Sequence, residues 1–249
     1  MNRLVKAEWY RITHSRNMFR NIILGALLLG VFPICASIGH FNEDLASVLE
    51  GSGAFTSFIF LMALPPAYSL ISGKVYDRGK LAYYEVMAGN RIRNIVGSKL
   101  LSTGMLFLGL STLSLSAFYA VVGLVNGSGG LDALPWRFLL LIVLLAHTIF
   151  CSILITIAFG RPGAAICYIR FIIFDTAALP FLTWLAGSVC GFNSLALHIA
   201  HMSIMNRLMM LIADPVDTML VLHTILGCLF ELLLWYAVIY SRMKRKKFK

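Results

Sequence analysis

Charged residues are scarce in this chain. They make up 13% of its 249 residues, whereas a soluble domain carries about a quarter. Hydrophobic residues reach 59%, and the mean hydropathy is +0.83. This composition excludes an ordinary soluble domain and predicts a polytopic membrane protein.

The sequence also lacks the short motifs of nucleotide binding and hydrolysis. It contains no GxxxxGK[ST] phosphate-binding loop, no HExxH zinc motif and no GxSxG nucleophile turn. Its five cysteines form no CxxC pair and no metal-ligand spacing. We interpret the cysteines as small apolar packing residues, and we expect no metal and no cofactor on this chain.

Long apolar runs fill most of the sequence. Each is near or above the ~20 residues that a helix needs to cross a bilayer. We therefore predict an all-α fold with six transmembrane helices in a single domain that covers residues 1–249. The runs are approximately 21–39, 54–73, 100–125, 136–160, 164–187 and 218–240.

The basic residues predict the orientation. All but Arg137 and Arg207 of the 21 Lys and Arg residues lie on one side if both termini are cytosolic, and Arg170 is expected to extend to that inner interface. Because these residues flank apolar runs, the net charge of +10 does not indicate nucleic-acid binding. We predict a multi-pass protein of the bacterial plasma membrane. The outer loops hold Glu43, Asp44, Glu50, Asp132, Asp214 and Asp217.

Residues 1–20 carry a helical apolar stripe of Val5, Trp9 and Ile12 with basic residues turned away. This pattern predicts a helix that lies in the membrane interface. Glu8 lies near the stripe and opposes this interpretation. The alternative is an ordinary basic segment before the first span.

The stretch 74–101 between the second and third runs is rich in Lys and Arg. Residues 76–90 have the periodicity of a short helix on a membrane surface. Gly89-Asn90 is a turn signal. A second helix is expected to follow, with Ile95 on its apolar side, and to enter the membrane after Lys99.

The segment 188–217 contains an apolar, Met-rich part that is too short to span a bilayer. We predict short helices in the outer leaflet, including His198, His201, Met202 and Met205. The two histidines are three positions apart, a spacing that suits a metal. No third ligand is close in sequence, so a metal site is not favoured.

His147, Asp175 and Glu231 fall near the middle of the fourth, fifth and sixth runs. An ionised carboxylate at that depth costs at least ~2.5 kcal/mol, so such groups normally face a protein interior or a wet cavity. One hypothesis is that these residues line a translocation path. The alternative is structural, with the three residues pairing between helices.

The loop YDRGKLAYYEVMAGNRIRNIVGSKLL, the N-terminal KAEWYRITHSR and the six spans resemble the permease subunits of ABC-2 type transporters. Gly89-Asn90 replaces the Pro that often stands in the family's turn. A narrower resemblance is to lantibiotic-immunity and bacitracin-type peptide exporters. The matching loop residues are Asp77, Gly79, Leu81, Arg91, Ile95, Lys99, Leu100 and Leu101.

This resemblance implies that a separate cytosolic ABC ATPase carries ATP and Mg²⁺, while this chain is not an enzyme. A second permease subunit, identical or related, completes the path. The segment 188–217 forms outer gating helices, and the substrate is an amphipathic peptide or lipid, such as a lantibiotic or another antimicrobial peptide. The basic tail 242–249 touches anionic membrane lipid. The ATPase docks on 76–90, chiefly at Asp77, Arg78, Gly79, Leu81, Tyr84 and Glu85.

Two alternatives stay open. One is a polytopic membrane enzyme that uses His147, Asp175 and Glu231, although no recognisable nucleophile or metal set accompanies them. The other is an ABC importer permease, because Glu85-Val-Met-Ala-Gly89 resembles the importer docking motif. The downstream spacing and the missing Pro do not fit that motif.

Overall fold

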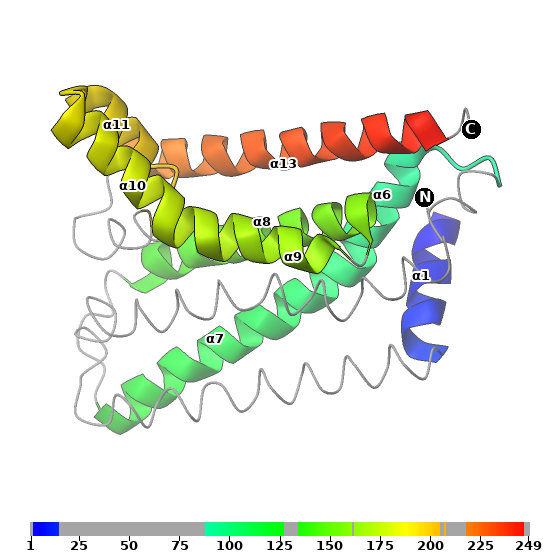
Figure 1. The fold of residues 1–249 in the computed structure, drawn as a ribbon. Helices are drawn as coiled ribbons and strands as arrows, with labels where there is room; N and C mark the ends of the chain where they lie inside the picture. Colours follow the sequence, from blue (N-terminus) through cyan, green and yellow to red (C-terminus); the bar gives the residue numbers. More distant parts are fainter. Residues whose placement is uncertain are drawn as a thin grey trace.

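A computed structural model of the protein describes residues 2–14, 88–126, 134–160, 162–204, 207 and 218–246. These residues form helices joined by turns (Figure 1). The described helices are α1 (Asn2–His14), α6 (Ile92–Lys99), α7 (Met105–Asn126), α8 (Leu134–Phe159), α9 (Gly163–Tyr168), α10 (Leu179–Trp184), α11 (Asn193–Ala200) and α13 (Thr218–Lys246), with π-helical segments η1 (Leu100–Gly104), η3 (Ile169–Ala178) and η4 (Leu185–Val189).

Four described stretches of helix are long and apolar enough to cross a membrane: Ile92–Leu124, Phe138–Phe159, Gly163–Val189 and Val221–Lys244. They cover the last four predicted apolar runs, and they confirm the expectation of an all-helical membrane protein for this part of the chain. The first two predicted runs, 21–39 and 54–73, lie outside the described residues.

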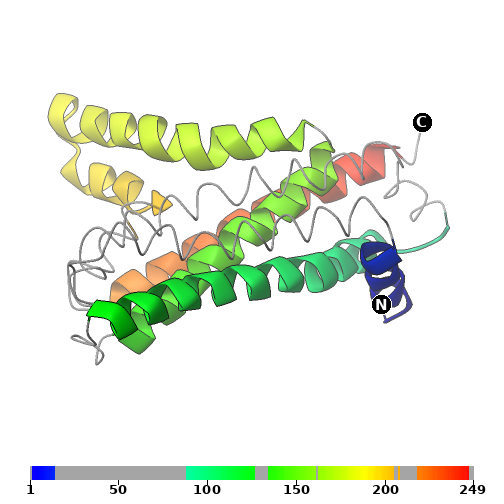
Figure 2. The same cartoon turned by 90° about the horizontal axis from the view of Figure 1, so that it is seen from below.

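Helix α8 is the central element of the described bundle. In its most apolar part 67% of the residues are buried, compared with 17% in α13. Helix α13 packs along α8 (Figures 1 and 2). Its side chains Phe230 and Leu233 are exposed. Exposed apolar side chains of this size fit a lipid-facing surface.

Polar side chains inside α8 bond to their own helix. Thr148 Oγ1 donates to the Leu145 carbonyl at 2.9 Å, and Ser152 Oγ donates to the Thr148 carbonyl at 2.5 Å. The hydroxyl donors of Thr148 and Ser152 are therefore paired although both residues are buried.

Two glycines stand where a side chain would be strained or crowded. Gly89 has φ +84, in the left-handed region that glycine adopts without strain, so the predicted turn before α6 is confirmed. A Cβ added at Gly187 would lie 3.3 Å from the Ala196 Cβ, so Gly187 allows η4 and α11 to approach closely. Helix α11 then folds back beside α10, as Figure 1 shows.

Helix α1 lies across one end of the bundle beside α6 (Figures 1 and 2). The predicted N-terminal helix is confirmed over Asn2–His14, with Ile12 buried and Trp9 42% exposed. Glu8, which opposed the amphipathic interpretation, is buried and accepts hydrogen bonds from Lys99 Nζ and, at 2.5 Å, from Arg11 Nη2. Lys99, expected where the helix enters the membrane, has its ammonium buried in this contact.

Candidate functional site: a polar network between the spans

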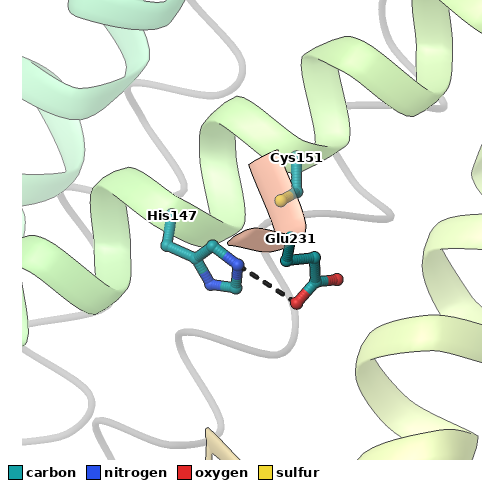
Figure 3. A group of neighbouring side chains, drawn as sticks. All are labelled: His147, Cys151 and Glu231. Atoms are coloured by element: carbon teal, nitrogen blue, oxygen red, sulfur yellow. Dashed lines mark ion pairs between the residues drawn. The ribbon is translucent and has the colours of Figure 1, made fainter. Parts of the chain in front are cut away.

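Two of the three predicted intramembrane polar residues meet directly. His147 on α8 is 2% exposed, and its Nε2 lies 3.2 Å from Oε2 of Glu231 on α13 (Figure 3). The two residues point toward one another from neighbouring helices. The interhelical contact that the structural alternative requires is therefore present, and a role in a translocation path stays a prediction.

Arg170 binds Glu231 through two parallel hydrogen bonds. Its Nε donates to Oε1 and its Nη2 donates to Oε2, both at 2.6 Å. Trp235 Nε1 adds a third bond to Oε1 at 3.3 Å. The expectation that Arg170 extends to the inner interface is wrong, because a carboxylate within the bundle offers its guanidinium a bidentate partner.

Asp175 is buried and joins the network through the same arginine, since Arg170 Nη1 lies 4.0 Å from its Oδ1. The two residues are five positions apart within the π-helical segment η3. Backbone hydrogen bonds in a π-helix link residues five apart, so this geometry places both side chains along one side. An ordinary α-helix would turn them to different faces.

Asp175 also holds the chain that follows α11. Its Oδ2 accepts a hydrogen bond from Ser203 Oγ at 3.1 Å, and its Oδ1 accepts one from the Ile204 backbone N–H at 3.0 Å. Span Gly163–Val189 is thus tied by a buried carboxylate to the segment between it and α13.

Arg207 anchors that segment to α13. Its Nε donates to the His201 carbonyl at 2.6 Å, and its Nη1 lies 3.6 Å from Cys228 Sγ. A Cβ added at Gly227 would lie 2.5 Å from Arg207 Nη2, so glycine makes room for the guanidinium. The sequence pattern predicted Arg207 on the outer side of the membrane, and that orientation stays a prediction; within the bundle its side chain is 8% exposed.

The acids and cations of this network are held in different ways. Asp175 and Glu231 both lie beside Arg170, whereas Arg207 donates to the His201 carbonyl and lies near Cys228 Sγ. An unpaired charge at membrane depth is costly, so each group depends on its partner. The network therefore joins α8, η3, α13 and the segment after α11.

Cys151 is the residue that the sequence analysis missed. One ligand atom each from His147, Cys151 and Glu231 lies within 4.8 Å of the others (Figure 3). His147 and Cys151 are four positions apart on α8, a spacing that puts both on one helix face. The sequence spacing could have predicted that His147 and Cys151 lie side by side. It could not have predicted that Glu231 approaches them from α13.

The remaining predicted site residues lie apart from this network. His198 lies in α11 and Met202 just after it, and both are exposed. His201 is partly buried, and its ring centroid lies 6.2 Å from that of His223. Burial, followed by the nearby His223, His198 and Arg207, lowers the pKa of His201 below its ordinary value. Met205 and the predicted docking residues lie outside the described residues: Asp77, Arg78, Gly79, Leu81, Tyr84 and Glu85.

Comparisons of the chain with protein-family models, with curated proteins and with solved structures found no match.

Proposed function

We propose that the chain is the permease subunit of an ABC exporter in the bacterial plasma membrane, with six spans and both termini in the cytosol. A separate ATPase hydrolyses ATP and docks on residues 76–90. Two permease subunits form the path for an amphipathic peptide or a lipid-like molecule, such as a lantibiotic.

The buried contact between Glu8 and Lys99 carries this proposal. It ties the N-terminal surface helix to the base of the span that begins directly after the proposed docking segment. A movement imposed on residues 76–90 therefore reaches α1 and α6 together. A permease driven by a cytosolic motor needs such a connection between its surface elements and a span.

The opposite end of the bundle supports an amphipathic substrate. Phe192, Leu195 and Met202 are each at least half exposed around α11. The segment is tethered to the spans through Asp175 and Arg207, so its position depends on the packing of the bundle. Exposed apolar and Met side chains adapt to varied apolar shapes.

The test is a mild-detergent pull-down of the full chain from its native membrane, followed by mass spectrometry. We expect a stoichiometric ATPase that is lost in Asp77→Lys and in Glu85→Lys, and a permease subunit, identical or related, in the same sample. Asp44→Lys, on the proposed outer side, is the matched charge-reversal control and retains the ATPase. Recovery of the intact chain alone would contradict the proposal.

The cluster of His147, Cys151 and Glu231 favours a second candidate, a membrane enzyme. A buried imidazole beside a thiol and a carboxylate is a set that supports acid–base or nucleophilic chemistry. An activity on lipid that persists without any ATPase and disappears in His147→Ala, while transport is absent, would select this candidate over the exporter.

A further inference from the structure

We propose that His147, Cys151 and Glu231 bind a zinc ion between α8 and α13. This metal site goes beyond the proposed transport function and does not depend on it. It would join a helix of the core to a helix whose outer face is exposed to lipid.

The positions of the ligand atoms fit such a site. Ligands of a tetrahedral zinc ion lie about 3.3–3.7 Å apart when the bonds are ~2.0–2.3 Å long. His147 Nε2 and Glu231 Oε2 are already 3.2 Å apart. All three ligand atoms lie within 4.8 Å of one another, so small shifts would bring them to coordination distances.

The chemistry of the donors selects the metal. A thiolate, an imidazole and a carboxylate are the three ligand types that zinc binds in proteins. Magnesium and calcium prefer oxygen ligands and would not recruit Cys151. Three protein ligands leave a fourth position for a water molecule or another group.

His147 provides a second observation. The residue is 2% exposed, and the 3.2 Å approach of its Nε2 to Glu231 Oε2 lacks hydrogen-bond geometry, so neither ring nitrogen makes a hydrogen bond within the part of the chain that the structure describes. Buried polar atoms are nearly always hydrogen-bonded, and an exception calls for a specific explanation. Coordination of zinc by one ring nitrogen supplies that explanation for His147.

Arg170 does not block the carboxylate. A carboxylate has about four lone-pair positions, and the two bonds from Arg170 take one on each oxygen of Glu231. Oε2 keeps a position toward His147, whereas the second position on Oε1 is taken by Trp235. Arg170 then acts as the outer partner that orients a metal-binding carboxylate. Binding converts the Cys151 thiol to thiolate, and the released proton goes to solvent.

The experiment uses the full chain purified without a polyhistidine tag, together with any subunits that remain bound. After dialysis against a chelator, zinc is restored and the metal bound per chain is measured by mass spectrometry of the elements. We expect about one zinc per chain, the stoichiometry of a mononuclear site. His147→Gln and Cys151→Ser should each weaken zinc binding at least ~10-fold. Cys167→Ser removes a thiol that is equally buried but outside the cluster, and it should bind zinc as the wild type does.

Cobalt replacement tests the thiolate directly. We expect a thiolate-to-cobalt absorption band in the near ultraviolet that Cys167→Ser keeps and Cys151→Ser loses. If Cys151→Ser does not fold, X-ray absorption of the zinc-loaded wild type decides, with a sulfur neighbour at ~2.3 Å expected. A wild type that retains no zinc, a band that survives in Cys151→Ser, or a metal shell without sulfur would overturn the proposal.

Discussion

Arg170 and Glu231 lie 61 positions apart in the sequence and form a bidentate ion pair between η3 and α13. Their side chains are 18% and 17% exposed, so both charges are largely removed from solvent. Removal of Arg170 leaves the Glu231 carboxylate with His147 and Trp235 as its remaining partners among the described residues. Arg170→Gln should therefore destabilise the protein by about 3–5 kcal/mol.

The measurement for this pair is unfolding in detergent micelles. The double variant Arg170→Gln with Glu231→Gln should recover part of the loss, because Glu231 no longer carries a charge and Asp175 keeps its hydrogen bonds from Ser203 and Ile204. Lys244→Gln, at an exposed position on the same helix as Glu231, is the control and should change little. Equal stability of Arg170→Gln and the wild type would contradict the importance of the pair.

Glu8 and Lys99 form the second buried pair, between α1 and α6. Lys99→Met should cost about 3–5 kcal/mol, since among the described residues only Arg11 would remain as a cation beside Glu8. The exchanged variant Glu8→Lys with Lys99→Glu restores opposite charges, and we expect it to be more stable than either single variant. The coupling energy follows from the unfolding, in one detergent, of the wild type, Glu8→Lys, Lys99→Glu and the double variant. A coupling energy near zero would contradict a direct contact between the two side chains.

Gly227 and Gly109 form a matched pair of helical glycines. Gly227→Ala places a methyl group where Arg207 Nη2 now lies, so we expect a loss of about 1–3 kcal/mol. Gly109→Ala meets no atom within 4 Å, and the better helix propensity of Ala should leave stability unchanged or raise it by up to about 1 kcal/mol. Thermal unfolding of both variants checks this difference, and the same shift at both sites would contradict it.

The lowered pKa of His201 predicts that the stability of the protein around the segment after α11 depends on pH. Because its pKa is lower in the folded protein than the ordinary value of 6.5, the unfolded chain binds more protons in that range. Stability is therefore complete above pH 6.5 and falls as the pH drops below it. Unfolding measured between pH 7.5 and pH 5 should show this decline, and the variant His201→Gln should show a shallower one. A decline of the same slope in both proteins would assign the effect to another group.

Much of the architecture follows from local pattern. The helices over 92–126, 134–160, 163–189 and 218–246 coincide with apolar runs that need no tertiary knowledge to be found. The amphipathic α1 and the Gly89 turn were also predictable, because periodicity and the conformational freedom of glycine act over a few residues.

The need of His147, Asp175 and Glu231 for partners follows from local sequence, because a polar group at membrane depth is costly wherever the chain places it. The identity of those partners depends on how the helices pack. Arg170 reaches Glu231 because η3 and α13 lie close together, and it reaches toward Asp175 because η3 is a π-helix. Helical periodicity puts Cys151 beside His147, but it does not specify the distance between α8 and α13. The approach of Glu231 to both residues therefore depends on the packing of these two helices.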